Sequence, residues 1–276
     1  MKMKMRVKIA IIVLCAIVAV VCLFPYFWMF TTSTREAAEV LTNPPRLWPN
    51  HLTLKNYYNV LFNTEIPRYF LNSFMVSLFS TLVCVFISAL AGFALAWFPF
   101  RGKNFWGIFI LCSQMVPGIA ILLPLYLLAD KLYLTNSRFG LAIIYQILVV
   151  PFCTWMLRGF FATIPHEIDE AAQIDGCTRF GAFLKIVLPI SAPGIFVTMM
   201  FSWMVTWEEF LFAVTFTRSK YSRTIPIGID SFMGEFYVDW GGIMASCILM
   251  SLPIVILFFF IQDKYIQGIA GGAVKG

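Results

Sequence analysis

The chain has 276 residues, of which 12% are charged and 60% are hydrophobic, and its formal net charge is +6 at pH 7. Soluble domains carry about 25% charged residues, and their surfaces need more polar groups than this composition supplies. The composition therefore excludes an ordinary soluble domain, a disordered chain and a small disulfide-rich scaffold, and it predicts a chain embedded in a membrane.

Six long segments contain no Lys, Arg, Asp or Glu, and each is long enough to cross a bilayer as a helix. They are residues 9–34, 69–100, 104–129, 139–157, 186–207 and 240–262. We expect an all-α integral membrane protein with six transmembrane helices. Their predicted cores are Ile9–Phe30, Tyr69–Trp97, Phe105–Ala129, Phe139–Leu157, Ile195–Phe216 and Ile243–Gln262. A buried soluble bundle would need amphipathic covering helices that this sequence lacks.

Four basic residues, Lys2, Lys4, Arg6 and Lys8, precede the first span and favour a cytoplasmic N-terminus. Six crossings then return the C-terminus to the cytoplasmic side of the cell membrane. The first apolar run is longer than that of a signal peptide, so it is expected to remain as an anchor. The expected organisation is a first helix over 1–30, an extracytoplasmic loop over 31–68, a core over 69–262 with a cytoplasmic loop at 158–190, and a cytoplasmic tail over 263–276.

The chain carries no recognisable catalytic or cofactor motif. Its cysteines form no Cys-x-x-Cys pair, and His51 and His166 are far apart, so no zinc-ligand set is expected. No G-x-x-x-x-G-K-[ST] loop is present, and neither is a His-Glu-x-x-His or Gly-x-Ser-x-Gly sequence. We expect a non-catalytic membrane subunit without a cofactor of its own.

Polar residues within the spans are candidates for a translocation pathway or a subunit interface. Asn72 and Gln114, like Gln146, can equally serve as ordinary contacts between helices. Glu208 and Glu209 are costly at membrane depth, so they either lie near the outer interface or face a polar interior. Prolines are also expected to kink the spans, at Pro25, Pro117, Pro124, Pro151 and Pro253.

The cytoplasmic segment 158–190 predicts two short helices. Thr163 is expected to cap the first, with Pro165 in its first turn and Gly176 at its end. One face of this helix holds Ile168, Ala171, Ala172 and Asp175. The small side chains of the alanines would let this face pack closely against another surface. Thr178 is expected to cap the second helix. Because the first helix is acidic, a protein partner suits it better than an anionic lipid surface.

Segment 170–189, EAAQIDGCTRFGAFLKIVLP, resembles the EAA motif of ABC importer permeases, E-A-A-x-x-D-G followed by nine residues and I-x-L-P. The matching residues are Glu170, Ala171, Ala172, Asp175, Gly176, Ile186, Leu188 and Pro189. The resemblance implies a type I permease fold in which this segment, with Ile168, is the coupling helix that docks on a cytoplasmic ATPase. It also implies a second homologous permease, two ATPase subunits that bind ATP and Mg, and an extracytoplasmic solute-binding protein.

The resemblance covers nearly the whole chain and is closest to the sugar-importer branch, as in PPRLWPN at 44–50 and LKNYYNVL at 54–61. The C-terminal GIAGGAVKG resembles the tail of the maltose-type second permease, which implies that Gly272, Val274 and Lys275 reach the ATPase interface. One departure is Glu208, where the family commonly has Asn.

The same resemblance implies that the outer loop, at about 217–240, contacts the binding protein. Its candidate residues are Arg218, Arg223, Asp230 and Glu235. The expected function is import of a sugar or oligosaccharide driven by ATP hydrolysis on a separate subunit. Alternatives are a permease of the same family for a non-sugar solute such as glycerol phosphate, and a secondary transporter.

Overall fold

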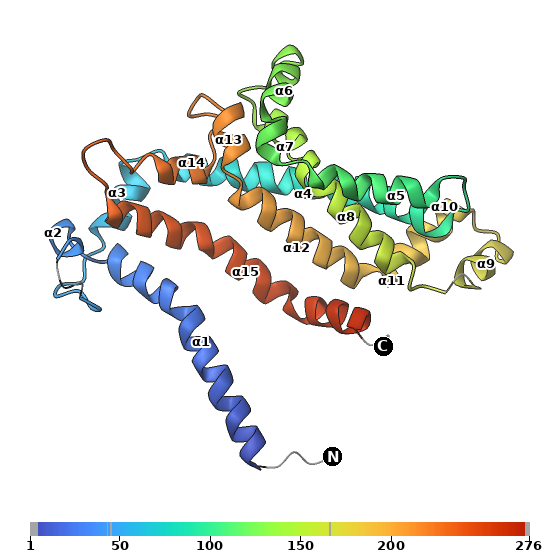
Figure 1. Cartoon of the computed structure of the whole chain (residues 1–276), viewed down its shortest axis with the longest axis horizontal. Helices are drawn as coiled ribbons and strands as arrows, with labels where there is room; N and C mark the ends of the chain where they lie inside the picture. Colours follow the sequence, from blue (N-terminus) through green and yellow to red (C-terminus); the bar gives the residue numbers. More distant parts are fainter. Residues whose placement is uncertain (1–4, 43, 45, 166, 274–276) are drawn as a thin grey trace. The chain divides into compact units, whose positions relative to one another are not determined.

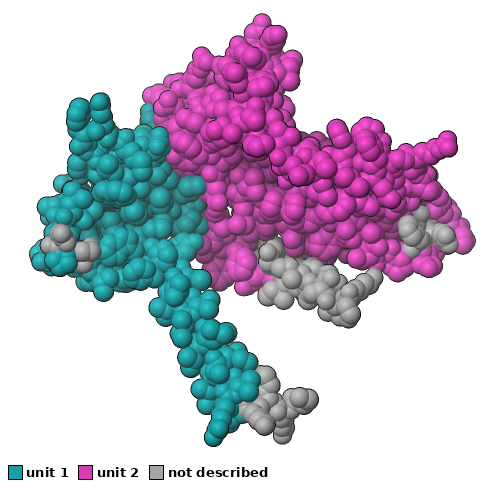
Figure 2. Space-filling model, in the orientation of Figure 1, with its two compact units in different colours: residues 1–67, 228–252 teal, residues 68–227, 253–276 magenta. Residues whose placement is uncertain are grey.

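A computed structural model describes residues 5–42, 44, 46–165 and 167–273. The chain divides into two compact units, which Figure 2 colours separately. Unit 1 comprises residues 1–67 and 228–252, and unit 2 comprises residues 68–227 and 253–276. The helices α4, α14 and α15 each contribute residues to both units.

Unit 1 is built around the first helix of the chain. It contains α1 (Met5–Ser33), α2 (Ala37–Val40), α3 (Lys55–Phe62) and the first part of α15 (Trp240–Ala273). The only buried residues of α1 are Thr31, Thr32 and Ser33 at its end, although the helix carries no charged residue after Lys8. Its apolar surface therefore has to be covered by lipid or by another protein.

A buried cation fixes the end of α1 within unit 1. Arg35 is 2% exposed, stacks over the ring of Trp28 at 5.1 Å and donates to the carbonyl of Arg46. The amide of Asn56 on α3 donates to the carbonyls of Ser33 and Arg35 at 2.9 and 2.8 Å. These contacts satisfy backbone groups that the end of a helix leaves free, so α3 is tied to the turn after α1.

Unit 2 holds the remaining helices, drawn from cyan to orange in Figure 1. They are α4 (Ile66–Trp97), α5 (Lys103–Cys112), η1 (Ser113–Met115), α6 (Gly118–Lys131), α7 (Arg138–Ile144), α8 (Gln146–Phe161), α9 (Glu167–Ile174), α10 (Arg179–Ala182), η2 (Phe183–Val187), α11 (Leu188–Ile190), α12 (Ala192–Glu208), α13 (Leu211–Phe216) and α14 (Ile225–Asp230).

A seam of small polar residues on α4 packs against α7 and α8. The buried positions recur every three or four residues, as expected for one helical face, and include Ser77, Ser80, Cys84 and Ser88. The hydroxyl of Ser80 donates to the carbonyl of Ala142, and that of Ser88 to the carbonyl of Val150. Small side chains let the backbones approach closely, and their hydroxyls form hydrogen bonds between the helices.

Gln146 and Gly92 extend the same seam. The amide of Gln146 donates to the carbonyls of Ser80 and Ala142 at 3.3 and 2.7 Å, which is the helix–helix contact considered for it from the sequence. A Cβ on Gly92 would lie 3.0 Å from the backbone nitrogen of Arg158. The seam therefore continues along α4 to its contact with the end of α8.

The six spans expected from the sequence match helices in the described part of the chain, three as single helices and three as bent pairs. Helices α1, α4 and α15 are each long and apolar enough to cross a membrane, and three further spans are bent pairs. The bend is 97° between Lys103–Met115 and Gly118–Lys131, 45° between Arg138–Ile144 and Gln146–Phe161, and 77° between Arg179–Ile190 and Ala192–Glu208. Figure 1 shows α6 leaving the direction of α5.

The expected third, fourth and fifth spans therefore differ from the structure. Of the five prolines expected to kink the spans, only Pro117 lies at one of the breaks, where it precedes α6 and has no N–H to continue a helix. The others lie within continuous helices. The fifth span does not continue to Phe216, because α12 ends at Glu208 and α13 begins at Leu211.

The last helix is longer than expected. The predicted core of the span ended at Gln262, and α15 continues through Ala273. Gly272 therefore lies in the last turn of a helix, whereas Val274 and Lys275 lie outside the described residues.

We expect Gly140→Ala to destabilise unit 2 by ~3 kcal/mol or more, since its Cβ would lie 1.8 Å from the carbonyl oxygen of Leu134. The matched control is Gly159→Ala, where no atom lies within 4 Å of the new Cβ, and helix propensity predicts a gain of ~0.5–1 kcal/mol. Thermal unfolding in detergent measures both, and equal melting temperatures for the two variants would contradict this packing.

Candidate functional site

The helix α9, expected from the sequence to be cytoplasmic, ends in a tightly defined turn. Gly176 has φ of +85°, a left-handed conformation that L side chains rarely adopt. The N–H of Cys177 donates to the carbonyl of Ala172 at 2.9 Å, and that of Gly176 to the carbonyl of Gln173 at 3.1 Å. These two bonds form a Schellman motif. They confirm that the helix ends at Gly176, as the sequence predicts.

One side of α9 is seated on the core of unit 2. Ala172 is 4% exposed, and Ile168 packs against a buried cluster. The cluster joins α4, α8, the turn after α8 and η2 through Ala89, Phe93, Leu157, Phe161, Ile164, Phe183 and Val187. Ile168 and Ala172 were expected to face a partner, but their contacts are within the chain. A displacement of α9 would therefore be transmitted directly to α4 and α8.

A second side of α9, next to the seated one, is open. Glu167, Ala171 and Ile174 are exposed at positions spaced by three and four residues, and Asp175 is exposed just after the helix. The side chain of Ile174 is 87% exposed. Analysis of the sequence missed Ile174, although an isoleucine away from the face of Ile168 in an acidic helix signals an outward apolar contact. Glu170 lies in this helix, and its side chain is outside the described part of the chain.

The start of α9 differs from the expectation. The helix begins at Glu167, so Pro165 precedes it and is not in its first turn. The hydroxyl of Thr163 donates to the carbonyl of Phe160 at 2.8 Å and therefore satisfies the end of α8. The expected cap bond from Thr163 to α9 involves residues outside the described part of the chain, so it stays a prediction.

The predicted second helix of this loop is confirmed in part. The hydroxyl of Thr178 accepts the N–H of Gly181 at 3.1 Å and caps α10, as expected. The helix then changes to a π turn, η2, before α11 and a sharp bend at Ser191. Single π turns within helices are frequent at functional sites.

Glu209 and Glu208 lie at the break between α12 and α13 and have different surroundings. The carboxylate of Glu209 accepts the N–H groups of Phe212 and Ala213 at 2.8 and 2.9 Å, which satisfies the first turn of α13. Glu208 is exposed. Gln114 is also exposed, next to the break before α6, and its amide donates to the carbonyl of Leu148 at 2.8 Å. The role of these residues in a pathway or an interface stays a prediction.

Asn72 holds the outer loop in place. It is buried, and its amide donates to the carbonyl of Arg223 at 2.8 Å. The next residue, Ser73, accepts the N–H of Ile225 at 2.8 Å. The structure thus gives Asn72 contacts within its own chain, while its proposed place in a pathway stays a prediction.

The residues expected to contact a binding protein are divided between the two units. In unit 2, Arg218 donates to the hydroxyl of Tyr126, and Arg223 is half-buried. In unit 1, Asp230 ends α14 and Glu235 lies in an exposed turn. Phe236, which analysis of the sequence missed, is 95% exposed beside Glu235. The aromatic pair Phe236 and Tyr237 directly after Glu235 was the available signal for it.

Residues 85–270 match the model of the family described as "Binding-protein-dependent transport system inner membrane component". The matched region includes α9 and the helical breaks at Tyr145 and Ser191. The chain belongs to this family. It is thus a multi-pass membrane permease of a binding-protein-dependent transport system.

Relatives of this permease match over nearly its whole length. It is 36% identical over 254 residues to the sulfoquinovosyl glycerol transport system permease protein SmoH of Agrobacterium fabrum, covering 92% of this chain and 89% of that protein. It is 34% identical over 272 residues to the trehalose/maltose transport system permease protein MalG of Thermococcus litoralis, covering 98% and 97%.

The fold is also that of an ABC importer permease. A chain of a bacterial ABC transporter involved in the import of the acidic polysaccharide alginate aligns with a TM-score of 0.81 and 19% identity, covering 96% of the permease and 100% of that chain. The expected type I permease fold is confirmed.

Gly176→Ala should loosen the end of α9 by ~1–2 kcal/mol, because a Cβ disfavours the left-handed conformation there. Gly176→Asn should have a smaller effect, since Asn adopts this conformation more readily. Hydrogen exchange of the Gly176 and Cys177 amides measures the change. Unaltered protection in the Ala variant would contradict the Schellman ending.

Proposed function

We propose that this permease imports a sugar or oligosaccharide and is driven by ATP hydrolysis on separate subunits. It would act with a second homologous permease, two ATPase subunits that hold ATP and Mg, and an extracytoplasmic solute-binding protein. The EAA motif and the family support this assembly. The relatives named above are permeases for sulfoquinovosyl glycerol and for trehalose or maltose, which supports a glycoside or sugar cargo.

The two-sided α9 is the observation that carries the proposal. One side is fixed to the core through Ile168 and Ala172, and the other presents Ala171 and Ile174. A helix that is both anchored and exposed is suited to dock in a cleft of a motor subunit and to move as a rigid body. Glu170, Asp175 and Gly176 belong to the same coupling element.

ATP would favour one of two arrangements of the spans, because closure of the ATPases binds the coupling helices differently in each. Three spans bend sharply near Pro117, Tyr145 and Ser191, and these bends are suitable places for a change of shape. Glu208, exposed at the end of α12, and Gln114, exposed beside the break before α6, are the candidates for contact with the partner permease or the pathway.

The exposed apolar surface of α1 supports a partner within the membrane. The outer turn with Glu235 and Phe236 is the candidate contact for the binding protein, together with Arg218, Arg223 and Asp230. The last turn of α15 at Gly272, followed by Val274 and Lys275, is the candidate contact of the tail with the ATPases. Purification of the complex and screening of its binding protein against sugars and glycerol phosphate would identify the cargo.

Ile174→Asp and Glu170→Lys should abolish uptake and release the ATPases while the permease still inserts in the membrane. Ile174→Ala, a milder truncation at the same position, should retain part of the uptake. Crosslinking from position 174 in native membranes measures the contact, and the isolated permease should show no ATP hydrolysis. Full transport by the Asp variant would contradict the role of this face.

The proposed topology places both termini and α9 in the cytoplasm. A membrane-impermeant maleimide should therefore label Cys177, which is partly exposed, in inside-out vesicles and not in intact cells. Cys177→Ser, with the other cysteines kept, controls for labelling elsewhere. Labelling of Cys177 from the outside would invert the topology.

A further inference from the structure

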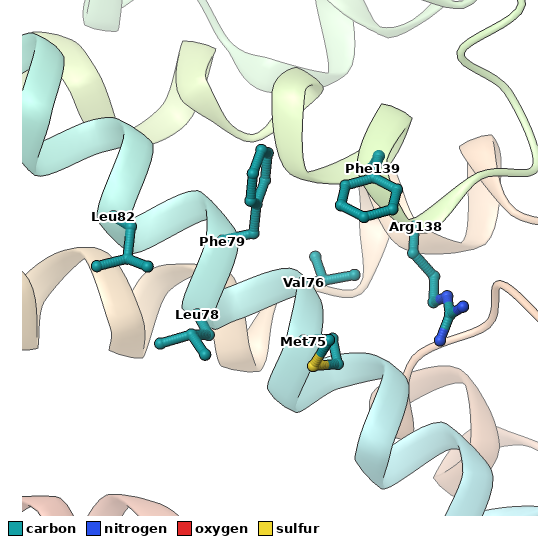
Figure 3. A pocket seen from close by; sticks show the side chains of 7 residues that line it. All are labelled: Met75, Val76, Leu78, Phe79, Leu82, Arg138 and Phe139. Atoms are coloured by element: carbon teal, nitrogen blue, oxygen red, sulfur yellow. The ribbon is translucent and has the colours of Figure 1, made fainter.

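A groove on unit 2 lies between α4 and α7, away from the coupling helix. Its cavity has a volume of about 170 Å³ and is lined by Met75, Val76, Leu78, Phe79, Leu82, Arg138 and Phe139. Figure 3 shows Phe79 and Val76 of α4 turned toward Phe139, with Arg138 at one end and Leu82 at the other. The rings of Phe79 and Phe139 meet edge to face at 5.4 Å.

The groove combines an apolar wall with one cation. On α4, Met75 and Leu82 are exposed, so the groove lies on the exposed face of this helix, opposite the small-residue seam. Phe139 of α7 is exposed beside them. Within the described part of the chain, Arg138 has no carboxylate partner. Its one side-chain hydrogen bond, at 3.4 Å, is to the amide oxygen of Asn72. Most of the donors of the guanidinium are therefore free to bind an anion.

We propose that this groove holds one phospholipid, with its phosphate bound by Arg138 and an acyl chain lying along Met75, Phe79 and Leu82. The planar guanidinium matches a phosphate with two parallel hydrogen bonds. Arg138 begins the fourth span, which the proposed topology places at the outer headgroup level. In a bilayer an apolar wall gains little from exchanging one hydrocarbon chain for another, so selective binding has to come from the phosphate contact.

The lining argues against a sugar in this groove. Arg138 is the only charged or hydrogen-bonding side chain among the seven, so the hydroxyls of a sugar would remain without partners. The proposal rests on the topology proposed above for the permease and not on its cargo or its ATPases.

The test uses the purified transporter complex, washed in maltoside detergent and supplied with phosphatidylglycerol, with bound lipid counted by native mass spectrometry. Arg138→Gln should weaken retention about tenfold, as expected for loss of a charged hydrogen bond. Leu82→Trp, which fills the groove and keeps the cation, should also lower it. Lys131→Gln removes an exposed charge outside the groove and should have no effect.

A photocrosslinking residue at position 82 adds a second readout in membranes. An adduct with the mass of a phospholipid supports the proposal, and an adduct with the partner permease shows that a protein helix occupies the groove and overturns it. Equal lipid retention in the Arg138 and Lys131 variants would also overturn it. Neither result depends on transport, so the outcome is independent of the proposed cargo and coupling.

Discussion

The close contact of α4 with α7 and α8 is the interaction on which unit 2 depends. Lipid tails are as apolar as leucine, so the hydrophobic effect does not hold helices together in a membrane. The serines of α4 instead let the backbones approach and bind carbonyls across the interface. The same helix holds the outer loop through Asn72 and Ser73 at one end, and supports α9 through Ala89 and Phe93 at the other. One helix of 32 residues, about 48 Å long, thus connects the two ends of the unit.

The spans and the coupling segment were predictable because both have strong local signals. Charge is excluded from lipid, so charge-free runs marked all six spans. The Asp175–Gly176 pair marked the end of α9, where the left-handed turn needs glycine. The break at Ser191 lies between Pro189 and Pro193, whereas the break at Tyr145 had no such signal, because neither Tyr145 nor an adjacent residue is proline or glycine. There the interruption follows from the packing of neighbouring helices, which a single sequence does not contain.

Side-chain roles were less predictable than helices. Glu209 and Glu208 are adjacent and chemically identical, yet one satisfies the start of α13 and the other is exposed. Ile168 and Ile174 lie in the same helix and face different ways, one toward the core and the other outward. Helical spacing separated those two isoleucines in principle, but which face was covered depended on the cluster beneath α9. That cluster comes from three separate parts of the chain: α4, α8 with the turn after it, and η2.

The π turn η2, Phe183–Val187, separates α10 from α11 near this cluster. Such a turn contains one residue more than an α-helical turn, and each residue of an α-helix rotates the chain by about 100°. Deleting a single residue here would therefore convert the π turn into a regular α-helical turn between α10 and α11. The departure from regular helix beside this cluster consequently depends on one extra residue.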